Sequence, residues 1–548
     1  MIQAGANHGK IPGMVSIVSR FVCCLNFLLL SNSLLAEAVN FERQAITIAL
    51  TQEPPNLNSI RMTDLLSYFV IGHVNEGLLR YDRKGRLAPG VAESWEVSDE
   101  KISFRLRRDA KWSDGSPVTA HDFVFAWRQV NDPTVAAPFA AIMHPLKNAE
   151  KVQNAELPVS ELGVSAIDDF TLEVILERPC GYCISLMAHA TFFPVKESFY
   201  QSTQEKYGAE VEQLLYNGPF MLTAWTHGSS MVMIKNPRYW NAAAIHLNEI
   251  NVGYITEDNR TRLNLFRDGS IALVRLGAET VQDASNQGLR LRTFVTGGVA
   301  YVWFNHRSGH VTSHRKIRKA IALVFDTNLF VNKIIAIPGY KPAYTFFPSW
   351  LNGVERKFSL EYPPTIVKPD STQALRLMAE AKKELNLDSL PELTLLTVTS
   401  PTGAKVAEFF QGLLNQSLGI TVKVDQQTFK QYLNKARAGQ FDLVLSSWYP
   451  DFNDIVTYAD LLASWNPNNR GEYVNAEYDR WFRVLQGSMD LTIRMGAAAE
   501  LQKIIIDDVP LLPTAETGSA YVQHPKLKGV VRRVLGQDPD YTFARVVE

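Results

Sequence analysis

A carboxylate stands among aromatic side chains in residues 446–454, which read SSWYPDFND. An apolar run over residues 441–445 precedes this segment and is typical of a buried strand. Two aromatic residues precede Asp451 and another follows it, so its surroundings should be poorly hydrated. Because an unpaired charge in such surroundings is costly, Asp451 either caps a turn or pairs with a cation that a ligand brings.

The sequence C-G-Y-C from Cys180 to Cys183 is a second candidate for chemistry. This spacing occurs in redox couples, in halves of zinc sites and in small structural disulfides. The chain has no second C-x-x-C, which excludes a zinc site of four cysteines. No thioredoxin-like strand and helix precede the motif, so we expect either a local disulfide or two unpaired thiols.

Three histidines, His306, His310 and His314, recur every four residues, and on a helix they would align as metal ligands. They follow a strand-like run, and Gly309 and polar residues lie among them, which favours a loop. We therefore expect neither a metal nor a cofactor.

The sequence does not indicate an enzyme. Adjacent carboxylates fall at predicted turns or helix ends, where solvation explains them. The motifs H-E-x-x-H and G-x-S-x-G do not occur.

Length and charge narrow the class of protein. With 548 residues and 46% hydrophobic content, the chain can supply more than one core, so two or more domains are expected. The formal net charge is −1, which leaves no electrostatic footprint for nucleic acid.

Residues 1–38 contain the pattern of a secretory signal peptide. Arg20 is followed by an apolar stretch over residues 21–35 and then by an A-x-A site that predicts cleavage after Ala38. The start could be Met1 or Met14, because the segment before Met14 is unusual for a signal peptide. The alternative, a membrane anchor, fits less well because polar residues interrupt the apolar stretch. We expect an exported, soluble protein.

The chain has a mixed α/β pattern throughout, most regular between residues 371 and 448. Strands are predicted at 45–50, 102–108 and 171–176, and a helix is predicted at 119–130. The regular part begins with a predicted helix that Ser371 caps and whose apolar positions are Leu375, Met378, Ala381 and Leu385. A strand at 393–399, a helix at 404–418 and a strand at 420–424 are predicted next. Thr428 then caps a helix with apolar positions Phe429, Tyr432, Leu433 and Ala436, and a strand at 441–447 follows.

This alternation predicts parallel strands joined by right-handed crossovers. In open sheets of this type, ligands bind beyond the carboxyl ends of the strands. Asp451 follows such an end, so we expect it at a cleft.

Several stretches resemble the extracytoplasmic solute-binding proteins of bacterial peptide ABC importers. They include NEGLLRYD (75–82), NGPFMLTAW (217–225), HRKIRKAIALVFD (314–326) and LAPGVAESWEVSDEKISFRLRRDAKWSDGSPVTAHDFVFAW (87–127). The resemblance extends over almost the whole chain after the signal peptide, in unbroken order.

The resemblance implies an α/β fold of the periplasmic-binding-protein type. Two α/β lobes would surround a hinge and cleft, with an additional inserted mixed α/β domain. Lobe I would be discontinuous, over residues 39–76, 198–300 and 519–548. The inserted domain II would be 77–197, and lobe III would be 301–518.

The resemblance also implies which residues bind the ligand. The family motif W-x-x-D-[YF]-N matches residues 448–453, so Asp451 corresponds to the carboxylate that holds a peptide ammonium. Leu65 falls where the family lends a backbone strand edge, and Phe139 and Phe429 fall where it has a pocket Tyr and a pocket Trp. For the aromatic residues, plain core packing is the alternative. The full predicted set is Asp451, Trp448, Tyr449, Phe452, Asn453, Leu65, Phe139 and Phe429.

One departure from the family concerns carboxylate binding. Where similar proteins have an Arg that can face ligand carboxylates, this chain has Leu445. The preferred ligand length therefore cannot be transferred from the family.

The function that the resemblance implies is that of the substrate-binding component of a peptide ABC transporter. The protein would capture short peptides in the periplasm, as a monomer, and deliver them to an inner-membrane permease complex. Nucleic acid would play no part. Within the same family, binding of murein peptides, or of a metal complex or haem, stays open.

Overall fold

The computed structural model describes residues 37–548, so most of the predicted signal peptide lies outside the described residues. No helix of the described part is long and apolar enough to cross a membrane. Three sheets of four or more strands organise this part of the chain. They make it a mixed α/β structure, as predicted.

The first sheet has five strands and is built from two distant parts of the chain. Its central strand β2 pairs parallel with β11, and β9 and β10 form an antiparallel hairpin beside them. The order is β1 (Val39–Asn40), β2 (Ala45–Leu50), β11 (Glu249–Ile255), β10 (Ser230–Lys235) and β9 (Phe220–Thr226).

The second sheet is antiparallel and has four strands, next to helix α3 (Ala120–Asn131). Its order is β5 (Ala92–Val97), β6 (Lys101–Leu106), β8 (Thr171–Ile175) and β7 (Val164–Asp168). Trp112 and Trp127 are among the largest fully buried side chains here.

The third sheet has seven strands and is mixed. Strands β15, β16 and β17 are parallel to one another, as the alternating pattern predicted, whereas β13 and β18 pair antiparallel. The order is β12 (Leu273–Leu276), β18 (Leu511–Gln523), β13 (Arg292–Phe304), β17 (Leu443–Trp448), β15 (Leu393–Val398) and β16 (Val422–Gln427), with β14 (Lys341–Pro342) beside β18.

Short strands and helices complete the described chain. Two small two-stranded sheets consist of β3 (Leu79–Tyr81) with β4 (Leu87–Pro89), and of β19 (Leu527–Lys528) with β20 (Arg545–Val546). The other α-helices are α2 (Leu65–Val74), α4 (Ala149–Gln153), α5 (Cys183–Leu186), α6 (Glu197–Thr203), α7 (Asn259–Arg267), α8 (Ala278–Asn286), α9 (Arg315–Val324), α10 (Thr327–Leu329), α11 (Phe358–Glu361), α12 (Ser371–Glu384), α13 (Pro401–Leu418), α14 (Phe429–Arg437), α15 (Val456–Ala459), α16 (Ala476–Gly487) and α17 (Leu491–Asp508).

Capping residues explain where the helices around the parallel strands begin. The side chain of Ser400 accepts a hydrogen bond from the amide of Gly403 at the start of α13, and Thr428 caps α14 as predicted. The predicted cap of α12 is wrong by one residue, because Asp370 accepts the amide of Gln373 (2.8 Å). A carboxylate at this position also interacts favourably with the helix dipole.

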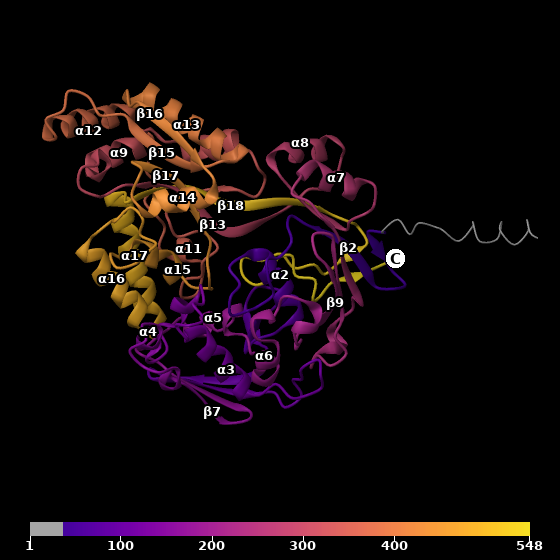
Figure 1. Ribbon diagram of the computed structural model, residues 1–548. Helices are drawn as coiled ribbons and strands as arrows, with labels where there is room; N and C mark the ends of the chain where they lie inside the picture. The colour runs from indigo at the N-terminus through magenta and orange to yellow at the C-terminus, as the bar shows by residue number, and fades with distance from the viewer. Residues whose placement is uncertain (1–36) are drawn as a thin grey trace, which may run out of the picture.

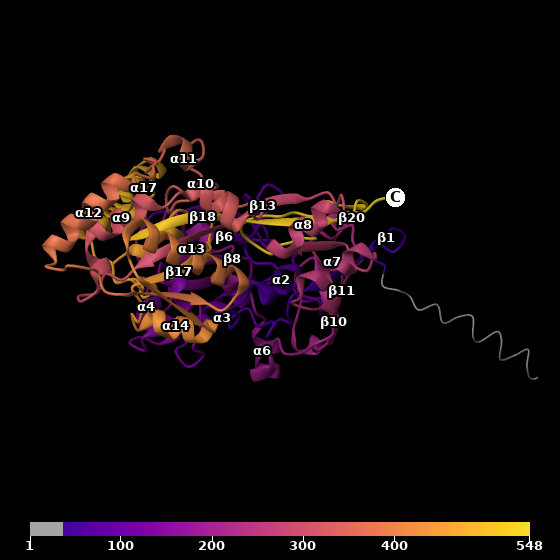
Figure 2. The same cartoon turned by 90° about the horizontal axis from the view of Figure 1, so that it is seen from above.

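The long strands β13 and β18 run side by side between two parts of the molecule (Figures 1 and 2). Strands β15, β16 and β17 lie at one end of this pair, and the five-stranded sheet lies towards the other. The four-stranded sheet forms the lower part of Figure 1. The predicted lobe boundaries at residues 300 and 518 thus fall inside strands that both parts share.

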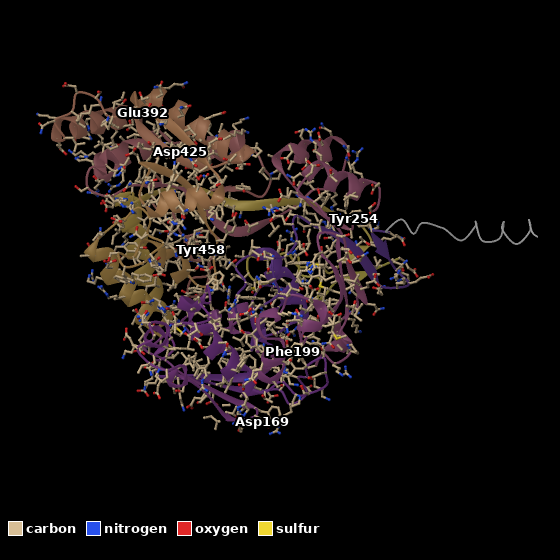
Figure 3. The ribbon with its side chains drawn as sticks, viewed as in Figure 1. Asp169, Phe199, Tyr254, Glu392, Asp425 and Tyr458 are labelled. Atoms are coloured by element: carbon tan, nitrogen blue, oxygen red, sulfur yellow. A yellow bond between two sulfur atoms is a disulfide. The ribbon has the colours of Figure 1, made fainter. Side chains whose placement is uncertain are left out.

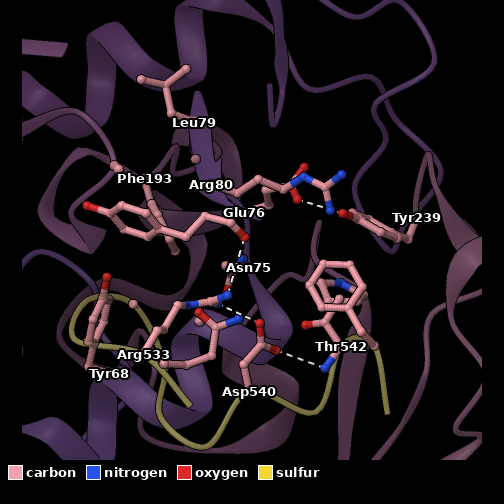
Figure 4. A pocket seen from close by; sticks show the side chains of 18 residues that line it. Tyr68, Asn75, Glu76, Leu79, Arg80, Phe193, Tyr239, Arg533, Asp540 and Thr542 are labelled. Atoms are coloured by element: carbon pink, nitrogen blue, oxygen red, sulfur yellow. Dashed lines mark hydrogen bonds and ion pairs between the residues drawn. The ribbon is translucent and has the colours of Figure 1, made fainter. Parts of the chain in front are cut away.

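A buried polar cluster joins helix α2 to the C-terminal segment (Figure 4). Arg533 pairs with Asp540, and the Asp540 carboxylate also accepts the amide of Thr542 at 2.8 Å. Burial acts to raise the pKa of Asp540, but Arg533 and His73 outweigh it and hold the pKa below its usual value. The cluster is internally paired, so we assign it a structural role.

Candidate functional site

A cavity of about 520 Å³ opens where β15 and β17 separate. Strand β17 pairs with β13 along its whole length but with β15 only at Leu443 and Val444. Beyond that point, residues 445–449 line the cavity together with the end of β15. The cavity therefore lies at the carboxyl ends of parallel strands, where the alternating pattern predicted a ligand site.

The separation leaves a free backbone edge on β17. The carbonyl of Leu445 accepts a hydrogen bond from the hydroxyl of Tyr432 (3.1 Å), which shows that it points away from β13. Since backbone groups alternate in direction along a strand, the amide and carbonyl of Ser447 point the same way. Within residues 37–548 they have no backbone partner on that side, so this edge can pair with an extended ligand.

The turn after β17 is held by Thr457 and by Asp454. The indole of Trp448 donates to the carbonyl of Thr457 (2.7 Å), and the Thr457 hydroxyl accepts the amide of Asp451 (3.1 Å). The carboxylate of Asp454 accepts the amide of Val456 (3.0 Å). Asp454, rather than Asp451, is therefore the carboxylate that caps this turn.

The carboxylate of Asp451 is half-buried and forms no hydrogen bond or ion pair with any described residue. Burial, reinforced by the nearby charge of Asp460, raises the pKa of Asp451 to about 6. Burial likewise raises the pKa of Asp460 to about 6, although Asn466 and Arg178 act in the opposite direction. At neutral pH this place is electronegative and poorly solvated, so a cationic group of a ligand would be stabilised here.

Three of the predicted residues lie together on the cavity wall, namely Trp448, Tyr449 and Phe429. Phe429 is 67% exposed although it belongs to the apolar face of α14. Leu433 and Tyr432 of the same face also line the cavity, Tyr432 as a largely buried side chain, and Ala436 is buried. The apolar face of α14 thus covers both the core and the cavity.

Leu65 and Phe139 do not line this cavity. Leu65 is 79% exposed, and it begins helix α2 rather than lying in a strand, because the carboxylate of Asp64 caps that helix. The structure therefore places a helix at Leu65 where the resemblance implied a strand edge. The ring of Phe139 packs against His189, with the ring centroids 5.3 Å apart.

Phe452 and Asn453 contact the segment around Tyr182 and Ser185 and do not line the cavity. Phe452 is buried and stacks on Tyr182, with ring centroids 5.5 Å apart. The carbonyl of Asn453 accepts a hydrogen bond from the hydroxyl of Ser185 (3.3 Å). Tyr182 lies within the loop that a disulfide between Cys180 and Cys183 closes, so this disulfide stands next to the segment that carries Asp451.

The three spaced histidines point to three different partners. His306 contacts the carbonyl of Pro510 (3.0 Å), His310 the carboxylate of Asp442 (2.8 Å) and His314 the carboxylate of Glu384 (3.1 Å). Among the residues that the structure describes, no group of three or more possible metal ligands comes together.

The pattern of the sequence did not single out Arg470, Tyr301 or Asp460. Arg470 and Tyr301 line the cavity, and Asp460 precedes Leu461, which also lines it. Tyr458 lies below the seven-stranded sheet in the view of Figure 3, and its hydroxyl donates to the carbonyl of Gly297 in β13. No local motif marks these positions, because their role depends on which strands and loops meet.

Comparisons with known proteins agree with this architecture. Residues 86–470 match the family model for the middle region of bacterial extracellular solute-binding proteins, family 5. The periplasmic oligopeptide-binding protein of Haemophilus influenzae is 30% identical over 92% of this chain and 93% of its own. The periplasmic murein peptide-binding protein of Escherichia coli is 29% identical over 89% of this chain and 90% of its own.

A solved structure extends the likeness to three dimensions. The substrate-binding domain of an oligopeptide ABC transporter from Bacillus anthracis superposes with a TM-score of 0.78 and 33% identity. The match covers 93% of this chain and 100% of that one.

Proposed function

The chain belongs to family 5 of the bacterial extracellular solute-binding proteins, and from this premise we propose that it captures short peptides for an ABC importer. The observation that carries the proposal is the free edge of β17 in the cavity wall, which leads to the unpaired carboxylate of Asp451. A protein that accepts varied peptides must recognise what they share, namely the backbone and the terminal amine.

The strand edge supplies the first of these contacts. An extended peptide added to Ser447 would form main-chain hydrogen bonds that do not depend on its side chains. The aromatic and aliphatic wall leaves room for side chains of differing shape, and ordered water could satisfy their polar groups.

Asp451 supplies the second contact. Its carboxylate would accept charge-assisted hydrogen bonds from the ligand ammonium, and these are stronger than hydrogen bonds between neutral groups. Asp460 adds a second negative charge close by. The ammonium would thereby fix the register of the peptide on β17.

We further propose the division into lobe I (39–76, 198–300 and 519–548), domain II (77–197) and lobe III (301–518). Its support is that the five-stranded and four-stranded sheets each fall within one of the first two units. A peptide would favour the arrangement in which the lobes enclose it, as a population shift limited by its preference for that arrangement. The permease in the inner membrane would receive the loaded protein from the periplasm.

The proposal is kept at the level of short peptides. The Haemophilus influenzae and Escherichia coli relatives are named for oligopeptides and for murein peptides, and both ligands carry a peptide backbone. Release of a co-purified ligand, followed by mass spectrometry, would identify which peptides this chain selects.

The test is calorimetry of Asp451→Asn with a free tripeptide and with its N-acetylated form. Loss of the anchor charge should weaken binding of the free tripeptide by about 2–5 kcal/mol, because the ammonium is left unpaired. Acetylation should weaken binding to the unaltered protein and add little in the variant.

Asp283→Asn is the matched control, since Asp283 is exposed on α8, far in sequence from the site. It should leave both affinities unchanged. Equal affinity of the unaltered protein for the free and the acetylated tripeptide would show that Asp451 is not an ammonium anchor.

A further inference from the structure

Arg470 is the one formally charged side chain among the described residues that line the 520 Å³ cavity. It is half-buried, and its guanidinium forms no hydrogen bond, ion pair or ring contact with any residue of the described chain. A guanidinium presents five donors in a planar fork that matches a carboxylate. A free fork inside a cavity is therefore a candidate contact for a ligand anion.

The surrounding contacts keep this guanidinium free. The nearest acidic residue in the sequence is Glu472, and Arg307 engages it at 2.9 Å. Arg307 also donates to the main-chain carbonyl of Arg470 (2.8 Å), which fixes the backbone there. Arg307 thus pairs with Glu472, the nearest possible counter-ion, and holds the backbone of Arg470 in place.

The position of Arg470 along β17 follows from two tyrosines. Burial raises the pKa of Tyr432, while the Ser446 hydroxyl and the Arg470 charge act in the opposite direction. The Tyr432 hydroxyl donates to the carbonyl of Leu445. Burial also raises the pKa of Tyr301, and the Arg470 charge acts to lower it; this tyrosine lies opposite Ser446 in the register of β13 and β17. The positive charge therefore acts near the beginning of the free edge.

Asp451 stands beyond the other end of that edge, and no ion pair joins it to Arg470 in the described chain. The three steps from Leu445 to Trp448 span about 10 Å at a rise of about 3.3 Å per residue. The edge is thus long enough for about three ligand residues, with a negative site beyond one end and a positive site at the other.

We infer that Arg470 binds a carboxylate of the captured peptide and thereby selects its length or its composition. The inference rests on the proposed function. Two sources of that carboxylate share the same chemistry, namely the C-terminus of a peptide of about three residues and an acidic side chain of a longer one. Leu445, which lines the same cavity, cannot make this contact.

The experiment measures affinities of the unaltered protein, Arg470→Gln and Arg470→Lys by calorimetry. The first ligand pair is a neutral tripeptide and its C-terminal amide. The second is a pentapeptide amide with Glu at the third position and the same peptide with Gln there. Removal of the carboxylate should weaken binding to the unaltered protein by about 10-fold to 100-fold, as expected for a hydrogen-bonded charge pair.

Within the ligand pair that the unaltered protein distinguishes, Arg470→Gln should bind both members equally, and Arg470→Lys should keep part of the preference for the member with the carboxylate. A preference within the first pair assigns the terminal carboxylate, and one within the second pair assigns the side chain. Arg437→Gln is the control, since Arg437 is exposed at the end of α14 and does not line the cavity. It should behave as the unaltered protein.

The inference is overturned if the unaltered protein shows no preference in either pair, or if Arg470→Gln keeps the whole preference. N-acetylation of the tripeptide should still weaken binding in Arg470→Gln, because the ammonium site is separate. An unaltered protein that binds none of these peptides would overturn the proposed function and this inference with it.

Discussion

At the scale of single residues, Asp451 and Asp454 stand three positions apart and have opposite surroundings. Asp454 accepts a backbone amide and pairs with Arg494 (2.6 Å), whereas the carboxylate of Asp451 has no partner within residues 37–548. Burying an unpaired carboxylate costs stability, and no contact of the fold offsets that cost, which supports the proposed ligand contact of Asp451. The position after a parallel strand predicted Asp451 at a cleft; in the structure Asp451 follows the cavity-lining residues 445–449 but does not itself line the cavity. Only the structure separates its surroundings from those of Asp454.

The raised pKa of Asp451 predicts that peptide binding weakens in acid. Burial and the Asp460 charge raise the pKa of Asp451 to about 6. Of the two carboxylates, Arg178 acts only on Asp460, where burial raises the pKa and Arg178 opposes the rise. From about pH 7.5 to about pH 5 Asp451, the proposed anchor, loses its charge, so affinity for a free-amine peptide should fall about tenfold. Calorimetry at the two pH values measures this fall in affinity. An N-acetylated peptide has no ammonium group, so its affinity should not fall.

The raised pKa of Asp451 should increase, in acid, the stability of the protein that holds no peptide. A folded-state pKa above the unfolded value means that the folded protein binds more protons between the two values. The free energy of unfolding should therefore rise as pH falls from about 7 towards 4, to the extent that Asp451 and Asp460 determine it. In Asp451→Asn this rise should be smaller, and an unchanged rise would contradict the assigned pKa.

Arg470 shows why some of the site could not be predicted from the sequence. A lone arginine in a loop is most often solvated, and nothing near it in the chain suggests otherwise. Its freedom depends on Arg307, 163 positions away, which takes Glu472. Its place at the cavity depends on the contact of its neighbour Gly471, whose carbonyl accepts the amide of His306 just after β13 (2.8 Å).

At the scale of elements, local patterns predicted the order of strands and helices from residue 371 to residue 448. Alternation and capping are local properties, so the parallel strands followed from them. Details set by tertiary contacts did not follow. Leu375, a predicted apolar position of α12, is 53% exposed, and Ala374 is buried in its place.

The contact between α17 and the turn after β17 predicts a large loss of stability in Arg494→Ala. The Arg494 side chain is 3% exposed and that of Asp454 is 11% exposed, so the variant leaves a buried carboxylate without its partner. The free energy of unfolding should fall by about 3–5 kcal/mol. Urea denaturation measures this change.

Arg480→Ala is the control for that experiment. Arg480 pairs with Glu477 on α16, but the two side chains are 57% and 65% exposed. Removal of such a surface pair should cost less than about 1 kcal/mol. Similar losses in the two variants would show that the Arg494 pair does not hold the turn.

At the scale of the whole molecule, β13 and β18 connect the part that contains the cavity to the five-stranded sheet and its surroundings (Figure 1). Between Val295 and Val299 the register of β13 shifts, and Gly297 adopts a φ of +82° that favours glycine. Gly518 of β18 lies so close to the backbone of Gly339 that a Cβ at position 518 would collide with the Gly339 carbonyl oxygen. The backbone of this joint therefore has no room for added atoms.

Gly518→Ala should consequently destabilise the joint, because one of two backbones must shift. We expect the free energy of unfolding to fall by about 1–3 kcal/mol, as overpacking usually costs. The control is Gly412→Ala inside α13, where a Cβ meets no atom within 4 Å. This change should raise stability by up to about 1 kcal/mol, and a Gly518→Ala protein as stable as the control would contradict the close approach.

The paired strands β13 and β18 also restrict how the molecule can move. Both strands belong to the seven-stranded sheet, and sliding one strand along the other would break the backbone hydrogen bonds of the register that begins with Arg292 opposite Tyr521 and Thr293 opposite Ala520. Bending across the plane of the pair keeps these hydrogen bonds, so the joint permits bending more easily than sliding. Under the proposed function, the two parts would enclose different peptides by the same bending motion, so a partner could meet one outer shape whatever the cargo.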